Sequence, residues 1–402
     1  MKIALVSEHA NPLADVGSVD AGGQNVHLAA LAKGLVDRGH DVTVFTRRDD
    51  PSTPTQTASP DGYVVELVPA GPPTEVPKDE LLAHMAAFSA YLEDRWTAER
   101  YDLVHSHFWM SGLAATTAAA AAGLPLVHTF HALGTVKRRH QGHRDTSPAE
   151  RIGVETQLCH TSDRIIATCS DEIRELRAMG MDTTRATVVP CGVDVHSFVP
   201  SAPAPSTRPR LLVLGRLVER KGVGNVITAL GQLPGVDLVV AGGPEPDALS
   251  ADPEVGRLRE LAAATGSTDR VDFVGRVHRA DVPALIQSVD VVVAVPWYEP
   301  FGIVPLEAMA CRRPVVGSAV GGLLDTVIPG RTGELVPPRR PDVLADTLRA
   351  LLAEPDRCAA YGWAGYERAV SIYRWEQVAA ATEAVYTSVL SRHPTAAAEM
   401  MR

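Results

Sequence analysis

The sequence lacks several features that mark common classes of protein. Aromatic residues make up only 5% of the chain, and no run of about 18 apolar residues is present that could span a membrane. The net charge of −10 argues against nucleic acid as a main partner. The first residues pass from one lysine into a short strand-like run, which does not predict a signal peptide. Together these absences favour a cytoplasmic protein that is not integral to a membrane.

Motifs for structural metals, disulfides and dinucleotides are also missing. The glycines near the N-terminus do not match G-x-G-x-x-G, and the second predicted strand ends in Thr-Arg-Arg instead of an acidic residue that could hold a ribose. The cysteines form no C-x-x-C pair, so neither a zinc site nor a disulfide framework is expected. They are Cys159, Cys169, Cys191, Cys311 and Cys358.

What the chain does contain is a regular alternation of short apolar runs with helical segments. β-branched residues are frequent in the apolar runs, and helical periodicity fills the gaps between them, as at 25–39 and 81–96. Strands joined by helices predict a parallel sheet that is covered on both faces. The predicted strands of the first half lie at 2–7, 41–46, 63–70, 102–107, 125–130, 164–169 and 186–191.

The alternation is interrupted once, at PSAPAPSTRP (200–209), which predicts an extended linker. A chain of 402 residues favours two domains. We therefore expect α/β architecture with two doubly wound domains, 1–199 and 210–374, facing across a cleft, with ligands beyond the carboxyl ends of the strands. A last helix at about 375–391 can cross back to brace the first domain. Strands of the second half are predicted at 210–215, 236–243, 271–275, 291–296, 314–319 and 334–338.

The most informative segment is 298–307, which carries Glu299 and Glu307 eight positions apart with Gly302 between them. A strand-like run precedes the segment and a helix-like run follows. Such a turn collects backbone N–H groups and the positive end of a helix dipole, which suits phosphate or sugar hydroxyls. Paired carboxylates can also serve acid–base chemistry, as in glycosidases. Beside an anion site, however, we expect these two to bind polyol hydroxyls.

Basic and glycine residues follow other predicted strands. Arg216 and Lys221 come after the first strand of the second half and suit a diphosphate, although two lone cations can also form a solvated basic turn. Gly242 and Gly243 follow the next strand. The two basic residues, these glycines and the glutamate segment 298–307 therefore converge on one sheet edge, which favours a ligand site there. Near the N-terminus, Gly22 and Gly23 let the backbone approach a ligand; a plain tight turn is the alternative.

Histidines stand near the ends of two strands of the first half. His128 lies within its strand, and a buried, hydrogen-bonded histidine is the default interpretation. His107 and His131 are placed at the carboxyl edge and could face the cleft. The following stretch, 134–158, is polar and basic, and we interpret it as a mobile acceptor loop in preference to a solvated basic surface.

These motifs, taken in order, resemble the retaining glycosyltransferases of family 4, which have the GT-B fold. The resemblance rests on GGQNVH (22–27), HSHFW (105–109), HTFH (128–131), GRLVERKG (215–222), AGGP (241–244), EPFGIVPLE (299–307) and the later pair of glycines in VGGLLD (320–325). It implies transfer of a hexose or amino-hexose from a nucleotide sugar to a small polar acceptor, with the departing diphosphate taking the acceptor proton. No cofactor or bound metal is implied.

The resemblance also assigns residues on the donor side. Arg216 and Lys221 would stabilise the departing diphosphate, an electrostatic role. Glu307 would bind the ribose, Glu299 the donor sugar, and His131 would lie next to the anomeric carbon. The remaining donor residues implied are Gly23 and Gly243 near the phosphates, Arg276 by the base, and the turn formed by Phe301, Gly302, Ile303 and Val304.

Within the family, the chain is most similar to mycothiol-type and sucrose-phosphate-synthase-like enzymes, so UDP is favoured over GDP. The acceptor side would comprise Gln24, Asn25, Lys78, His107, Phe108 and Arg151. Phe108 and Ala132 replace a tyrosine and a threonine of the mycothiol group, which predicts a polar acceptor other than inositol phosphate. The competing hypotheses are a nucleotide-sugar-binding protein without transfer, and an epimerase or phosphorylase. A homodimer is the base-rate expectation.

Overall fold

The computed structural model describes residues 1–14, 22–201 and 208–393, and the chain folds as two units. Unit 1 comprises Met1–Pro190 and Trp375–Arg402, and unit 2 comprises Cys191–Arg374. The predicted boundary after residue 199 is therefore too late. The Val193 N–H donates to the Tyr373 carbonyl at 2.7 Å, and Phe198 is buried in a core cluster of unit 2. Of the predicted linker, residues 202–207 lie outside the described residues.

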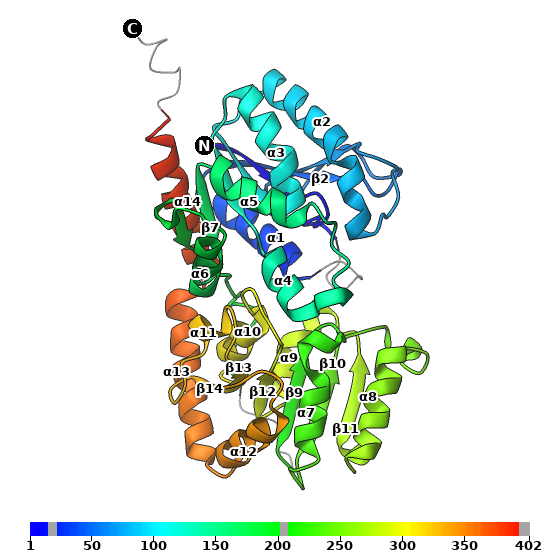
Figure 1. The fold of residues 1–402 in the computed structure, drawn as a ribbon. Helices are drawn as coiled ribbons and strands as arrows, with labels where there is room; N and C mark the ends of the chain where they lie inside the picture. Colours follow the sequence, from blue (N-terminus) through cyan, green and yellow to red (C-terminus); the bar gives the residue numbers. More distant parts are fainter. Residues whose placement is uncertain (15–21, 202–207, 394–402) are drawn as a thin grey trace. The chain divides into compact units, whose positions relative to one another are not determined.

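Unit 1, which carries the labels β2 and β7 in Figure 1, is built on an eight-stranded sheet in the order β3-β4-β2-β1-β5-β6-β7-β8. Every strand predicted in the first half is present. The sequence did not predict β3, three residues paired antiparallel with β4 at the edge of an otherwise parallel sheet. The strands are β1 Lys2–Val6, β2 Asp41–Arg47, β3 Gln56–Ala58, β4 Val64–Val68, β5 Leu103–His107, β6 Leu126–Thr129, β7 Arg164–Ala167 and β8 Ala186–Val188.

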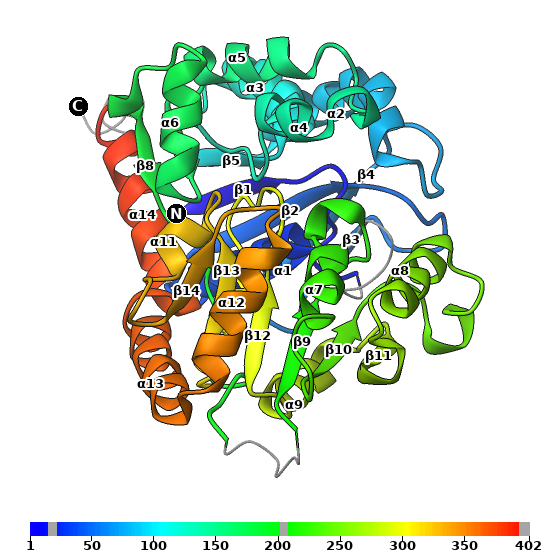
Figure 2. The same cartoon turned by 60° about the horizontal axis from the view of Figure 1, so that its bottom comes forward.

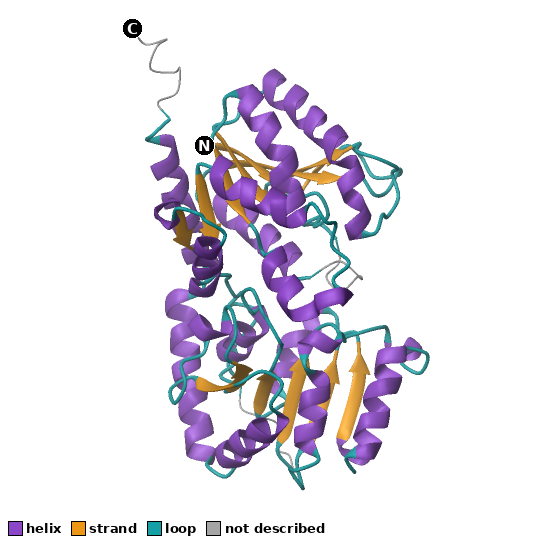
Figure 3. Ribbon diagram, viewed as in Figure 1, coloured by secondary structure: helices purple, strands orange, loops and turns teal. Residues whose placement is uncertain are grey.

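Helices cover both faces of this sheet. Phe88 of α2 and Trp109 of α3 are buried in the core on one face, and Leu28 of α1 and Tyr386 of α14 in the core on the other. The C-terminal helix α14 thus belongs to unit 1, where it packs beside α1. The helices of unit 1 are α1 Gly23–Val36, α2 Met85–Ala98, α3 Trp109–Ala122, α4 Gly134–Gln141, α5 Arg151–Thr161, α6 Ser170–Ala178 and α14 Trp375–Leu390, coloured by type in Figure 3.

The basic stretch 134–158 is not a loop, which corrects the sequence-based interpretation. It forms α4, a 3₁₀ turn at Gly142–Arg144 and the start of α5. Its charges are paired within unit 1: Lys137 with Asp145 at 3.0 Å, and Arg151 with Glu155 at 2.8 Å. Both acids follow their basic partners within the same stretch, so its polar composition reflects paired charges near and within helices.

Unit 2 has a six-stranded parallel sheet in the order β11-β10-β9-β12-β13-β14. Figure 2 shows α7 and α12 with the sheet they cover. All strands predicted in the second half are present. They are β9 Arg210–Leu214, β10 Asp237–Ala241, β11 Val271–Gly275, β12 Val291–Ala294, β13 Val315–Ser318 and β14 Gly333–Val336. The helices are α7 Val223–Leu230, α8 Pro253–Ala264, α9 Val282–Gln287, α10 Ile303–Ala310, α11 Leu323–Thr326, α12 Pro341–Leu352 and α13 Pro355–Ile372.

In each sheet the strand order reverses at one point. That point lies between β1 and β5 in unit 1 and between β9 and β12 in unit 2. Loops leaving the carboxyl ends of strands separate there, and in doubly wound sheets the opening receives the ligand. Among the described residues, no helix is long and apolar enough to cross a membrane.

Candidate active site

The reversal point of unit 2 holds an ion pair between Lys221 and Glu299. Lys221 closes the 3₁₀ turn Glu219–Lys221 after β9, and Glu299 follows β12. Their Nζ and Oε2 atoms are 2.5 Å apart, and both side chains are largely buried. Burial raises the pKa of the Glu299 carboxyl, but Lys221, Arg220 and Arg216 together lower it further, so the net pKa lies below its ordinary value. Burial also lowers the pKa of the Lys221 ammonium, which Glu299 only partly offsets.

Backbone contacts fix the distance between these two side chains. A Cβ on Gly222 would lie 2.1 Å from the Val295 carbonyl oxygen, and Gly222 has φ +76°, so only glycine fits there. The Trp297 N–H donates to the Arg220 carbonyl at 2.8 Å. The loops after β9 and β12 are therefore joined along their backbones. The ion pair is a consequence of this packing and not of flexible side chains meeting by chance.

A second backbone contact supports the turn between Glu299 and α10. The Gly322 N–H donates to the Glu299 carbonyl at 2.9 Å. A Cβ on Gly321 would lie 1.9 Å from that same oxygen. Behind the turn, Gly302 is the N-cap of α10, so the N–H groups of Ile303 and Val304 have no partner within the helix. They are available to a phosphate or hydroxyl oxygen, as the sequence predicts for this turn.

Glu307 is buried inside α10, and Arg279 donates to its Oε1 atom. Arg279 lies in the 3₁₀ turn Arg279–Asp281 after β11. Burial raises the pKa of the Glu307 carboxyl, and Arg279 opposes that rise without cancelling it. Sequence reasoning missed Arg279. The only signal was a second basic residue three positions after Arg276, which a pattern cannot connect to a carboxylate 28 residues later.

The other donor-side candidates of unit 2 also lie at carboxyl ends of strands. Arg216 is exposed directly after β9, and Gly243 follows β10 with φ +87°. Arg276 follows β11 and forms an ion pair with Glu245 at 3.0 Å. The structure therefore brings Lys221 and Glu299 together directly, and places Arg276 two strands away along the same sheet.

In unit 1, acceptor-side candidates gather around the Phe108 ring. The Lys78 Nζ lies 3.8 Å from the ring centroid and the Arg151 guanidinium carbon 5.1 Å from it. Phe108 has φ +79°, a strained value for a residue with a side chain. Arg151 is buried, and its three guanidinium nitrogens donate to Glu155, Ser147 and the Ala132 carbonyl. Lys78 is thus the more accessible of the two cations.

Two further acceptor-side candidates are tied to the loop after β1. Gln24 Nε2 donates to Ser7 Oγ at 3.1 Å, and Asn25 Nδ2 donates to the Asn11 carbonyl at 3.0 Å. Gly23 is the first residue of α1. Sequence reasoning missed Glu8 in the same loop, where burial raises the pKa of its carboxyl but His9, Ser111 and Lys78 lower it to a net value below normal. Most of the glycine-rich loop, residues 15–21, lies outside the described residues.

The histidines form a buried cluster in unit 1, at the carboxyl ends of β5 and β6 where the sequence placed His107 and His131. His107 is completely buried, and its Nδ1 lies 2.9 Å from His131 Nε2. His27, which the sequence did not single out, lies beside both. One nitrogen of each ring falls within 4.8 Å of the others, an arrangement that could hold a metal ion. A hydrogen bond already joins His107 Nδ1 and His131 Nε2.

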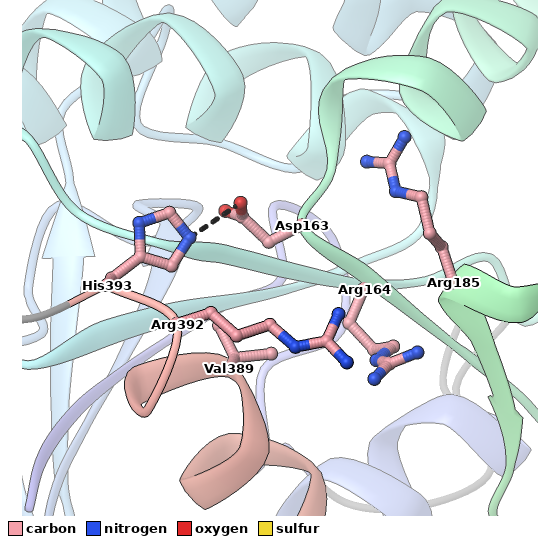
Figure 4. Close-up of a pocket in the computed structure, with 6 residues that line it drawn as sticks. All are labelled: Asp163, Arg164, Arg185, Val389, Arg392 and His393. Atoms are coloured by element: carbon pink, nitrogen blue, oxygen red, sulfur yellow. Dashed lines mark hydrogen bonds and ion pairs between the residues drawn. The ribbon is translucent and has the colours of Figure 1, made fainter.

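A separate surface cavity of about 270 Å³ lies in unit 1 and contains none of the candidate residues (Figure 4). His393 and Asp163 interact on one side of it at 2.9 Å. Two of its arginines donate to main-chain carbonyls, Arg164 to Thr184 and Arg185 to Ser162. Because these guanidinium groups are used in bracing the backbone, we assign the cavity no part in the chemistry. Its lining is Asp163, Arg164, Arg185, Val389, Arg392 and His393.

Comparison with known protein families shows which family the chain belongs to. Residues 21–197 match the model of Glycosyltransferase Family 4, and residues 196–368 match that of Glycosyl transferases group 1. The chain belongs to the family 4 glycosyltransferases. The enzyme is therefore a hexosyltransferase with the GT-B fold that uses a nucleotide sugar donor, as the sequence motifs predicted.

Relatives of this glycosyltransferase match along nearly its whole length. A D-inositol 3-phosphate glycosyltransferase of Xylanimonas cellulosilytica is 36% identical over 413 residues, covering 98% of each chain. A solved sucrose-phosphate synthase from Thermosynechococcus elongatus has 32% identity and a TM-score of 0.90, covering 97% of this chain and 99% of its own. Anabaena HepE, solved with UDP and glucose, has 22% identity and a TM-score of 0.75 over 96% of this chain and 100% of its own, and is similar in fold.

Proposed function

We propose that this glycosyltransferase moves a hexose or amino-hexose from a UDP sugar to a small polar acceptor and retains the anomeric configuration. The observation that carries the proposal is the Lys221–Glu299 pair at the reversal point of unit 2. A diphosphate needs a cation there, and a donor sugar needs a hydrogen-bond acceptor for its hydroxyls. The paired side chains supply one group of each kind within a largely buried setting, where charge is worth more than in water.

The reaction proposed is a displacement on one face of the sugar. The bond between the anomeric carbon and the β-phosphate oxygen breaks, and the acceptor oxygen bonds to that carbon from the same side. The acceptor proton passes to the departing phosphate oxygen. Lys221 and Arg216 stabilise the negative charge that collects on the diphosphate, and Glu299 orients the sugar through its hydroxyls. No enzyme carboxylate acts as a nucleophile.

For the acceptor, we propose a small molecule that carries an anionic group such as a phosphate. Lys78 beside the Phe108 ring supports a negatively charged ligand. The two most informative relatives are named for inositol 3-phosphate and for sucrose phosphate. Because Phe108 has no hydroxyl to donate, we expect a sugar phosphate to be preferred over inositol phosphate.

The test is release of nucleotide from UDP and GDP sugars with sugars, sugar phosphates and inositol phosphate as acceptors. We expect UDP release that depends on an acceptor, an α-linked product from an α-linked donor by NMR, and no loss of rate in EDTA. Arg216→Ala should abolish release. Release without any acceptor would indicate an epimerase or hydrolase, stoichiometric binding without release a binding protein, and loss in EDTA a role for the histidine cluster.

Substitutions of Glu299 and Glu307 should have different effects on binding and on turnover. Glu307→Gln should weaken UDP binding by about tenfold to a hundredfold, the value of a hydrogen bond to a charged group. Glu299→Gln should mainly lower kcat, because the sugar is oriented less well while the nucleotide still binds. Calorimetry with UDP and steady-state rates with the donor separate the two effects. An equal fall in UDP affinity for both variants would contradict the roles assigned.

A further inference from the structure

The partner of Glu307 comes from outside the motifs that define the family. Glu307 lies on α10, whereas Arg279 follows β11, on the opposite side of β9 from β12 in the sheet order. The Arg279 guanidinium carbon also lies 4.7 Å from the centroid of the Phe198 ring, which is buried. A guanidinium that stacks on a buried ring and donates to a buried carboxylate has few alternative rotamers. The Arg279 side chain is 36% exposed, but these two contacts restrict its guanidinium to a donor position beside Glu307.

Arg279 contacts only one of the two carboxylate oxygens of Glu307. Arg279 donates to Oε1, and no described residue donates to Oε2. A carboxylate is planar and has about four lone-pair positions. When Oε1 is held by a donor, the direction of Oε2 is fixed as well, and Oε2 can accept a hydrogen bond from a ligand. The open Oε2 is what a site would retain for a ligand hydroxyl.

We propose that Arg279 is the positioning residue of the nucleotide ribose site: by holding Oε1 of Glu307, it directs Oε2 at a ribose hydroxyl and sets the preference for ribonucleotides over deoxyribonucleotides. The proposal rests on the function proposed above, in which Glu307 binds the ribose. The new element is that the preference for ribonucleotides requires both Arg279 and Glu307, and not the Glu307 carboxylate alone.

Arg279 also favours the charged form of the carboxylate. Burial raises the pKa of Glu307, and Arg279 is the group that opposes this rise. The other titratable group near Glu307 is Cys311, directly after α10, and burial raises the pKa of its thiol to about 12. Cys311 therefore stays neutral between pH 6 and 9. Loss of Arg279 should therefore raise the pKa of Glu307 further.

The experiment measures the dissociation constants of UDP and 2′-deoxy-UDP by calorimetry at several pH values. The variants are Arg279→Lys, Arg279→Met, Glu307→Gln and the double variant Arg279→Met/Glu307→Gln. Arg257→Met is the matched control, because Arg257 forms an exposed pair with Glu254 in the same unit. Melting temperatures exclude simple misfolding. Ratios to wild type at each pH remove the titration of the nucleotide itself.

We expect Arg279→Met to weaken UDP binding about tenfold at pH 7 and to change 2′-deoxy-UDP binding little. The ratio of UDP affinity to deoxy-UDP affinity should then fall to the value found for Glu307→Gln. Its UDP affinity relative to wild type should recover as the pH rises, since Glu307 then ionises without help. Arg279→Lys should retain most of the discrimination, and the double variant should be no worse than Glu307→Gln.

Two results would overturn the inference. One is an unchanged ratio of UDP to deoxy-UDP affinity in Arg279→Met. The other is additive losses in the double variant, which would mean that Arg279 contacts the nucleotide independently of Glu307. If wild-type protein binds neither UDP nor GDP, the proposed function fails instead, and that outcome is distinct from either of these.

Discussion

Single residues with unusual backbone angles stand where unit 1 is expected to meet its ligands. Phe108 and His131 have φ of +79° and +59°, although both carry side chains. They follow β5 and β6, neighbouring strands at the reversal point. Such strain costs about 1–3 kcal/mol per residue and persists where the surrounding packing demands it. The sequence could place both residues at strand ends, but it contained no signal for their backbone conformation.

A buried carboxyl in unit 1 should make stability fall as pH rises. Burial raises the pKa of Glu172 to about 7 from an unfolded value of 4.5. Between these values the folded state binds more protons than the unfolded state. Glu172 therefore contributes full stability below pH 4.5 and loses it as the pH passes 7. The difference of about 2.5 units corresponds to about 3 kcal/mol.

Glu172→Gln should remove this dependence. The amide oxygen can still accept from the backbone N–H of Thr168, which donates to Glu172 at 2.8 Å, and it carries no charge at any pH. Hydrogen exchange of α6 amides at pH 5 and pH 8 measures the local stability. The variant should gain stability over wild type at pH 8 and not at pH 5. The exposed Glu80→Gln is the control, and equal shifts in both variants would contradict the assignment.

At the scale of elements, the sequence predicted the parallel strands and missed what tertiary contacts create. The parallel strands could be predicted because buried strands of this kind carry continuous apolar runs, which are visible in the sequence. Edge strand β3 has only three residues and forms by pairing with β4. Helices α4 and α5 are polar, and ion pairs such as Arg139 with Glu175 connect them to other helices. Neither kind of information is present in the local sequence.

The turn from β12 to α10 depends on Gly321, which lies on another loop. A Cβ there would meet the Glu299 carbonyl oxygen, and its φ is +49°. Gly321→Ala should therefore displace the backbone of Glu299 and lower the transfer rate at least a hundredfold, with a loss of about 2–3 kcal/mol in stability. Rates and urea unfolding measure the two effects.

Gly330→Ala is the matched control for this prediction. Gly330 has a similar φ of +73° but open space around its Cβ position. It should lose some stability from backbone strain and keep the transfer rate. If Gly330→Ala lowered the rate as much as Gly321→Ala, the effect would come from strain in general and not from contact with the Glu299 turn.

At the scale of the whole chain, the sequence predicted two α/β units and the return of the last helix to the first, but it did not locate the first crossing. The proline-rich segment at 200–209 was the visible marker, whereas the division lies at Pro190 and Cys191. The second crossing, between Arg374 and Trp375, lies where the sequence predicted that the last helix returns to the first domain. It is defined by contacts: Trp375 lies edge-on to His27 with ring centroids 5.5 Å apart, and Glu383 pairs with Arg38.

Because α14 belongs to unit 1, a change near the C-terminus should weaken the N-terminal half of the chain. Tyr386 is completely buried, and its hydroxyl lies 2.7 Å from His105 Nδ1 on β5. Tyr386→Ala should destabilise unit 1 by about 3–5 kcal/mol, the usual cost of truncating a buried aromatic residue. Tyr386→Phe should cost only about 1 kcal/mol, that of one hydrogen bond. Hydrogen exchange should show lost protection in β1 and β5 and unchanged protection in β9 and β12, with UDP affinity as in wild type. Equal loss of protection in both sheets would mean that the two units unfold as one cooperative body.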